Sequence, residues 1–135
     1  MKPFGNQIKE AERYLNNAKQ ILSEKAGKEG YFYSDPKYVK MAGNTAWNGV
    51  LVALDATLDV RSNLKKGVRP DVMDYQKALL AKDKKIYPFF TSAYETLHKS
   101  MGYDGILKCK IVQSGMEDAN AVVSWASKHY KEGVS

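Results

Sequence analysis

The sequence predicts an all-α protein, namely an antiparallel up-and-down four-helix bundle with one short additional helix. Three observations lead to this prediction. Apolar residues recur at steps of three and four along four long segments, residues typical of helix ends flank these segments, and no strand-like alternation competes with them. At 135 residues the chain has the size of one domain, so residues 1–135 are expected to share a single core.

The first helix is predicted to start at Asn6, whose side chain can accept hydrogen bonds from free backbone amides, and to end before Gly27. Its apolar stripe consists of Ile8, Ala11, Leu15, Ala18 and Leu22. The aromatic stretch between Gly27 and Ser34 is too short for a helix, and we expect a packed loop there.

The second helix is predicted to begin at Pro36, because Ser34 or Asp35 can cap it and proline suits the first helical position. Lys65 and Lys66 followed by Gly67 are typical of a helix end, which gives a helix of about 30 residues. Gly49 should let a neighbouring backbone come close. The stripe of this helix is Val39, Ala42, Ala46, Leu51, Leu54 and Leu58.

Asp71 is predicted to cap a short helix that carries Val72, Tyr75 and Leu79. Asp83 can start the following helix, although Pro88 requires that helix to begin close to Pro88 or to bend there. Its stripe is Ile86, Phe90, Ala93, Leu97 and Met101.

Gly102 is predicted to end that element and Asp104 to cap the last helix, which has the clearest stripe of all. The connections between helices are short, which favours antiparallel neighbours. The stripe of the last helix is Ile106, Cys109, Val112, Met116, Ala119, Val123, Ala126 and Tyr130.

No stretch resembles a signal peptide or approaches the length of a membrane span, so we expect a cytoplasmic protein that does not enter a membrane. Cys109 is the only cysteine. An intramolecular disulfide and a cysteine-based zinc site are therefore excluded, and a buried structural thiol is expected. No cofactor is predicted.

The positive charge is regional. The formal net charge is +6, and residues 61–110 hold 11 lysines and arginines against 5 aspartates and glutamates. Such a surface can hold phosphate, so weak RNA or anion binding is predicted at two basic turns; the alternative is that these charges only keep the protein soluble. The turns contain Lys65, Lys66 and Arg69, and Lys82, Lys84 and Lys85.

The turn from His98 to Gly105 is the second candidate site, because His98, Tyr103 and Asp104 place a titratable ring, a donor and an acceptor within a few residues. The competing interpretation is a plain connection between helices. No nucleophile motif accompanies these residues, so the sequence does not predict an enzyme and no catalytic residue is assigned.

Glu95 and His98 form the Glu-x-x-His spacing that di-iron bundles use. Such sites need a second copy of the motif and two further glutamates, whereas this motif occurs once. A metal-binding bundle is therefore the third function considered, and no metal ligand is assigned.

Residues 11–18, residues 46–58 and the long last helix resemble HEPN-like helical bundles, in particular a small family of uncharacterised bacterial proteins of Bacteroidetes type. The resemblance implies a four-helix core, homodimerisation, and either a nucleotidyltransferase partner or RNA or nucleotide binding. Active HEPN ribonucleases carry an arginine followed four to six residues later by a histidine. Here Arg13, Arg61 and Arg69 are the only arginines, and none stands at that distance before His98 or His129.

The function predicted from the sequence is therefore that of a non-enzymatic binding or interaction bundle, expected to form a homo-oligomer, in particular a dimer, and to contact a protein partner. The alternative is an RNA- or nucleotide-binding HEPN-like domain.

Overall fold

The all-α class is confirmed by the computed structural model, which describes residues 4–134 without the side chains of residues 4, 5, 63 and 131–134. The described chain is helical apart from its loops and one very short hairpin. Its elements are α1 (Phe4–Glu24), β1 (Lys28–Glu29), β2 (Phe32–Tyr33), α2 (Pro36–Thr57), the 3-10 turn η1 (Arg61–Asn63), α3 (Val72–Lys82), α4 (Tyr87–Ala93), the π-helix η2 (Tyr94–Tyr103) and α5 (Cys109–Val134).

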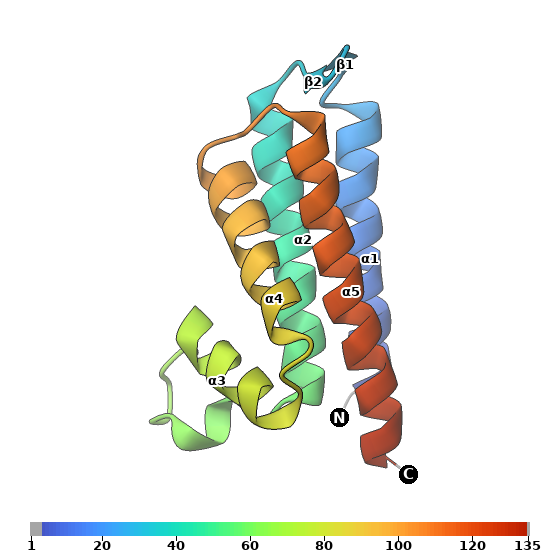
Figure 1. Ribbon diagram of the computed structural model, residues 1–135. Helices are drawn as coiled ribbons and strands as arrows, with labels where there is room; N and C mark the ends of the chain where they lie inside the picture. Colours follow the sequence, from blue (N-terminus) through green and yellow to red (C-terminus); the bar gives the residue numbers. More distant parts are fainter. Residues whose placement is uncertain (1–3, 135) are drawn as a thin grey trace.

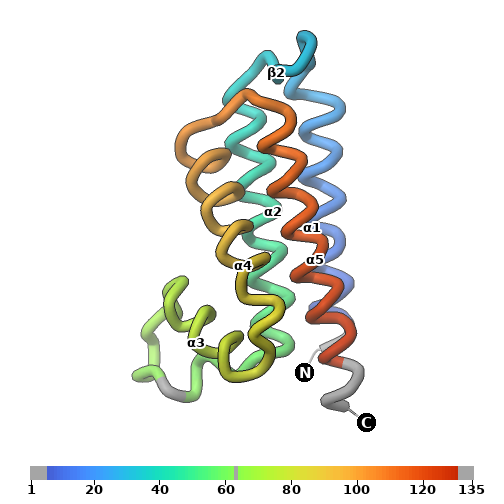
Figure 2. The backbone as a smooth tube through the Cα atoms, in the orientation of Figure 1, coloured from blue at the N-terminus to red at the C-terminus, as the bar shows by residue number. Residues whose placement is uncertain are grey.

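Four long helical segments lie side by side, and each runs opposite to the one before it in the chain (Figure 1). They are α1, α2, α4 continued by η2, and α5. The short helix α3 is set apart from them, as the tube in Figure 2 also shows. At one end, here called the hairpin end, lie the loops 25–35 and 104–108. At the opposite end, the terminal end, α1 begins, α5 ends, and the segments 58–71 and 83–86 turn.

The core contains the apolar stripes that the sequence predicts, together with buried residues outside them such as Trp47, Val50 and Val122. Every stripe residue of α1 and of the segment from Ile86 to Met101 is buried. Of the stripe predicted for the second helix, only Leu51 is half-buried. Of the stripe predicted for the last helix, only Ile106, Cys109 and Tyr130 are half-buried. None of the helices described in residues 4–134 has both the length and the apolar character needed to cross a bilayer. The largest fully buried side chains are Phe90, Leu54, Leu79, Leu97, Met101, Val39, Val50, Val112 and Val122.

The two predicted caps of α2 and α3 are confirmed. The Asp35 side chain accepts a hydrogen bond from the Lys37 amide, and Pro36 occupies the first turn of α2. Asp71 accepts from the amide of Asp74, whose own side chain accepts from the Asp71 amide, which completes a capping box at the start of α3. Both helices therefore begin where short-range chemistry places them.

The predicted end of α2 is wrong. The helix stops at Thr57, because Leu58 is extended and the side chains of Leu58 and Val60 turn into the core. Burial of these two side chains outweighs the local preference to continue the helix. Lys65 and Lys66 consequently lie in an exposed loop after η1, and Gly67, with a φ of 86°, shapes that loop instead of capping a helix. The helix α1 also starts earlier than predicted, at Phe4, so that Asn6 lies in its first turn.

The segment predicted as a packed loop contains a hairpin. Lys28 pairs with Tyr33 and Glu29 with Phe32 in an antiparallel register. Of its aromatic residues, Tyr33 is buried, whereas Tyr31 and Phe32 are exposed, so the expected packing of the whole segment is wrong.

Asp83 does not start a helix. It ends α3, where its amide donates to the Leu79 carbonyl, and α4 begins at Tyr87 with Pro88 in its first turn. The expectation that the helix begins close to Pro88 is therefore correct, since proline there removes no helical hydrogen bond.

Asp104 does not cap the last helix. It lies at the end of η2, where its amide donates to the Lys99 carbonyl, and α5 begins five residues later, at Cys109. The chain between them runs along the hairpin: the Leu107 carbonyl accepts from the Tyr33 amide, and the Cys109 amide donates to the Tyr31 carbonyl. These tertiary hydrogen bonds keep the segment extended.

The π-helix η2 packs closely on α2 at Gly43. A Cβ at Gly43 would lie 2.6 Å from the Leu97 carbonyl oxygen and 2.6 Å from Met101 Cβ, so only glycine permits this approach. The π-helical hydrogen bonding shifts the side chains of η2 relative to an α-helix, and such segments are frequent at functional sites.

Candidate functional site

A pocket of about 230 Å³ lies where α1, α2, the loop after η1 and α3 meet. It brings together two of the chain's three arginines with a carboxylate, two tyrosines and an amide. We call it the arginine pocket. Its lining residues are Tyr14, Asn48, Leu51, Val52, Asp55, Arg61, Arg69, Pro70 and Tyr75.

A hydrogen-bonded pair forms the inner wall of the arginine pocket. The Tyr75 hydroxyl donates to Asp55 Oδ1 at 2.7 Å, and Arg61 Nη2 lies 3.9 Å from Asp55 Oδ2. Burial of Tyr75, reinforced by its hydrogen bond to Asp55, raises the pKa of its hydroxyl far above the ordinary range. Tyr75 therefore stays protonated and holds the carboxylate in one orientation.

Arg69 is the freer of the two guanidinium groups. It is exposed, and among the described residues it makes no hydrogen bond or ion pair, although its charge acts on the Tyr75 hydroxyl. Pro70 and the capping box at Asp71 hold the backbone directly after it. The backbone next to Arg69 is thus fixed by the start of α3, and the N–H donors of its guanidinium group are available to a ligand.

Close packing of α1 on α2 places Tyr14 in the pocket. A Cβ at Gly49 would lie 2.8 Å from Tyr14 Cβ and 3.1 Å from the Ala11 carbonyl oxygen. The expectation that Gly49 admits a neighbouring backbone is confirmed. Because α1 comes this near, the half-buried Tyr14 lies alongside Asn48 of the next helix.

A second groove, of about 400 Å³, adjoins the arginine pocket at Val52, which lines both. It is lined by Asn6, Gln7, Lys9, Glu10, Arg13 and Val52. Arg13 Nη1 donates to Glu10 Oε2 at 3.0 Å, on the exposed face of α1. All three arginines of the sequence therefore line these two neighbouring hollows.

The predicted basic turns lie together at the terminal end, on either side of α3 (Figure 1). The residues concerned, Lys65, Lys66, Arg69, Lys82, Lys84 and Lys85, are all exposed. Lys82 also lines a groove of about 820 Å³ between α3 and the end of α2, together with Lys77, Asp59 and Asp74. That groove is lined by two lysines and two aspartates, whereas the arginine pocket is lined by two arginines and one aspartate, so the arginine pocket offers the better anion site.

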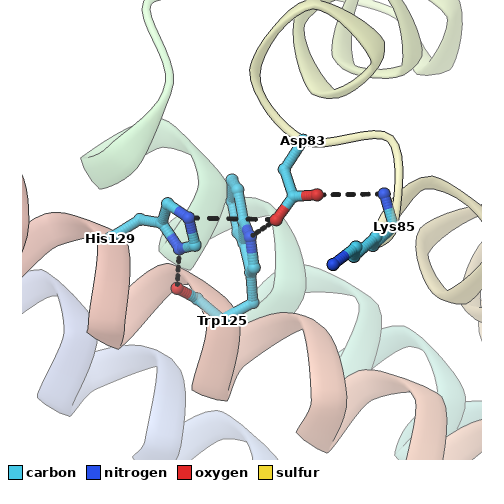
Figure 3. Close-up of polar contacts among 4 residues, drawn as sticks. All are labelled: Asp83, Lys85, Trp125 and His129. Carbon is cyan, nitrogen blue, oxygen red and sulfur yellow. Dashed lines mark hydrogen bonds and ion pairs between the residues drawn. The ribbon is translucent and has the colours of Figure 1, made fainter.

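The turn before α4 is tied to α5 by Asp83 (Figure 3). Trp125 Nε1 donates to Asp83 Oδ2 at 3.0 Å, and the Lys85 amide donates to Asp83 Oδ1 at 3.0 Å. His129 stacks on Trp125 with ring centroids 4.2 Å apart, and its Nε2 lies 3.9 Å from Asp83 Oδ2. The hydrogen bond from Trp125, followed by that from Lys85, lowers the pKa of the Asp83 carboxyl.

The predicted site at His98 is a cluster of aromatic rings. His98 stacks on Tyr94 at 5.5 Å, meets Tyr103 edge-on at 5.2 Å and lies 5.9 Å from Trp47. Its Nδ1 is buried and has no hydrogen-bond partner among the described residues. The structure thus brings His98 and Tyr103 together, while Asp104 is exposed at the end of η2.

Glu95 pairs with Lys99 Nζ at 3.7 Å, while His98 packs among the rings, so neither residue is arranged around a common ligand position. In residues 4–134, as far as their side chains are described, no group of three or more His, Cys, Asp or Glu could hold a metal ion. Cys109 is half-buried instead of buried, and it lines a groove of about 460 Å³ with Tyr33 between α1 and α5.

Five residues that line the arginine pocket are not among the site residues that the sequence predicts, namely Tyr14, Asn48, Asp55, Arg61 and Tyr75. One usable signal was present, since two of only three arginines stand within nine residues of each other in a chain rich in lysine. Tyr75 is one of the residues that the predicted short helix carries, and it is buried there, but its hydroxyl is the part that reaches Asp55.

The family model described as "Domain of unknown function (DUF5618)" matches residues 6–128 of the chain. A solved structure described as a protein of unknown function from Dyadobacter fermentans is similar, with 45% sequence identity and a TM-score of 0.85, over 94% of this chain and 98% of that chain. No match was found among curated proteins. The predicted likeness to uncharacterised proteins of Bacteroidetes type is confirmed by this neighbour.

Proposed function

The chain belongs to the DUF5618 family, and we propose that it is a non-enzymatic binding protein for single-stranded RNA. The observation that carries the proposal is the convergence of Arg61 and Arg69 on one pocket within a loop that also exposes Lys65 and Lys66. Arginine forks match phosphate oxygens in geometry and charge, and exposed lysines add an attraction that depends little on base sequence.

The two groups of basic residues lie where a single RNA strand can contact both. The loop 61–70 precedes α3 and the turn with Lys82, Lys84 and Lys85 follows it, at the same end of the molecule (Figure 1). The resemblance to HEPN-like bundles implies RNA or nucleotide binding independently of this arrangement.

Binding without cleavage is proposed because the histidines are engaged elsewhere. His98 is packed among aromatic rings and His129 stacks on Trp125, and neither lines the arginine pocket. The arginine pocket accordingly holds groups that bind phosphate but no histidine to move a proton.

The test is fluorescence anisotropy with a single-stranded RNA oligonucleotide between about 50 and 200 mM salt. One variant replaces Lys65, Lys66, Arg69, Lys82, Lys84 and Lys85 with Gln. The matched control replaces six other exposed lysines, namely Lys19, Lys25, Lys40, Lys108, Lys110 and Lys128. We expect the first variant alone to lose affinity and to flatten the salt dependence. Equal losses in both variants, or no RNA binding by the parent protein, would overturn the proposal.

A second candidate function, association with another copy of the chain, is favoured by exposed apolar side chains on and around α3. Val68, Met73, Leu80 and Phe89 are between 42% and 58% exposed. Exposed apolar side chains that form one patch often mark an interface. Sedimentation equilibrium should show a dimer that the double change Met73→Gln and Leu80→Gln weakens, with Gln113→Asn on α5 as the control. A parent protein that stays monomeric would exclude this candidate.

A further inference from the structure

We infer that the arginine pocket is a defined site for one nucleotide, with the phosphate on Arg61 and Arg69 and the base beside Tyr14 and Asn48. The inference rests on the proposed function insofar as the nucleotide belongs to an RNA strand. It goes further, because it assigns the recognition of one unit to particular residues instead of to a general positive charge.

The phosphate half of the site is formed by two guanidinium groups with free donors. Arg69 has no partner among the described residues, and the Arg61 contact to Asp55, at 3.9 Å, is too long for a hydrogen bond. Each planar group can therefore turn a pair of N–H donors to phosphate oxygens. Asp55 repels a phosphate on its own side, so the anion is directed toward Arg69.

The base half combines a flat apolar surface with an amide. Tyr14 supplies an aromatic ring on which any base can stack, and Leu51 and Pro70 line the pocket beside it. Asn48 is exposed and carries both a donor and an acceptor, the combination that pairs with the edge of a purine such as adenine.

Asp55 and Tyr75 also line the pocket. Asp55 accepts one hydrogen bond from Tyr75, which leaves further lone pairs on its oxygens. A ribose hydroxyl is a donor of the right kind for them, and the 2′-hydroxyl is the group that distinguishes RNA from DNA. The site is therefore expected to prefer a ribonucleotide.

The pocket holds at most one unit. Its volume of about 230 Å³ is smaller than the pockets that hold drug-sized ligands, which start at roughly 300 Å³, and a nucleoside monophosphate is itself of that size, so part of the nucleotide lies outside the pocket. The adjoining groove, with Lys9 and Arg13, continues from Val52 and provides a path for the next phosphate of a strand.

The experiment titrates the full chain with adenosine 5′-monophosphate and, separately, with adenosine, 2′-deoxyadenosine 5′-monophosphate and inorganic phosphate. Binding is followed by calorimetry and by amide chemical shifts. We expect the monophosphate to saturate one site, to shift the amides of Tyr14, Asn48 and Arg69, and to bind more tightly than each of the other three probes.

The double change Arg61→Gln and Arg69→Gln should weaken binding by about tenfold or more, because hydrogen bonds to charged groups are lost. The control, Lys25→Gln with Lys128→Gln, removes the same charge from exposed positions outside the pocket and should leave affinity within about twofold. If the arginine variant does not fold, Asn48→Asp serves instead, and it should weaken binding by about tenfold or more, because it removes the amide donor to the base and adds a second carboxylate to a pocket that already holds Asp55.

Four results decide the matter. No saturable binding, an equal loss in the control, or unchanged affinity in the arginine variant or in Asn48→Asp would overturn the inference. If the RNA oligonucleotide still binds in those cases, the proposed function stands without a nucleotide pocket. If the monophosphate binds as expected but the oligonucleotide does not, the pocket is supported and the RNA-binding function is wrong.

Discussion

Trp125 Nε1 donates a hydrogen bond to Asp83 Oδ2 at 3.0 Å, and this bond links the α3–α4 turn to the last helix (Figure 3). The same carboxylate accepts from the Lys85 amide. One aspartate thus holds a turn with three exposed lysines, Lys82, Lys84 and Lys85, against the bundle.

This relationship predicts an acid-sensitive contribution to stability. The pKa of the Asp83 carboxyl is lowered in the folded protein, chiefly by the Trp125 hydrogen bond. Its stabilising effect is therefore complete above the unfolded-state pKa of about 4 and is lost as the pH falls through the lower folded-state pKa. Urea unfolding below about pH 4 should show a smaller loss of stability in Asp83→Asn than in the parent protein. Parallel pH profiles would contradict the assignment.

Introducing a charged side chain into the buried apolar stripes is expected to lower stability strongly. Leu54 is fully buried and Val123 is 3% exposed. Leu54→Asp or Val123→Asp should each lower the free energy of unfolding by several kcal/mol, roughly 3 to 5, because an unpaired carboxylate has no solvent there. Thermal unfolding of both variants is compared with exposed Asn120→Asp as the control. Unchanged midpoints would mean that the core is placed wrongly.

Asp71 and Asp104, both of which the sequence predicts as helix caps, should respond differently to substitution. Asp71 makes a complete capping box, whereas Asp104 is an exposed residue at the end of η2. Asp71→Ala is expected to reduce stability by about 1 kcal/mol, and Asp104→Ala to stay within about 0.5 kcal/mol of the parent. Chemical denaturation measures both. A larger effect at Asp104 than at Asp71 would be incompatible with the observed helix boundaries.

A substitution at His98 tests whether this residue belongs to a functional site or only packs among aromatic rings. Its Nδ1 is buried without a partner among the described residues, and its ring contacts three aromatic side chains. His98→Phe keeps an aromatic ring and removes the unsatisfied nitrogen, so stability should be maintained or increased. RNA and nucleotide binding should not change. Loss of binding in a folded His98→Phe protein would move the functional site to this cluster.

Gly49 connects packing to the arginine pocket. A methyl group at this position would press on Tyr14, so Gly49→Ala should destabilise the protein by about 1 to 3 kcal/mol even though alanine favours helices. Nucleotide affinity should fall as Tyr14 is displaced. The exposed change Asn17→Ala, on α1, controls for the gain in helix propensity. A stabilised Gly49→Ala variant would show that α1 and α2 can separate without cost.

The sequence by itself determined the helical class, the core stripes and the starts of α2 and α3, because these depend on residues three or four positions apart. It could not determine where α2 ends or where α5 begins. Burial of Leu58 and Val60 decides the first boundary, and the hydrogen bonds from the Tyr33 amide to the Leu107 carbonyl and from the Cys109 amide to the Tyr31 carbonyl decide the second. The arginine pocket likewise exists only in the folded chain, since Asp55 and Tyr75 stand 20 residues apart and meet by the return of α3 toward α2. Interactions between residues close in the sequence can be predicted from the sequence. Contacts between distant segments depend on which surfaces pack together in the folded chain.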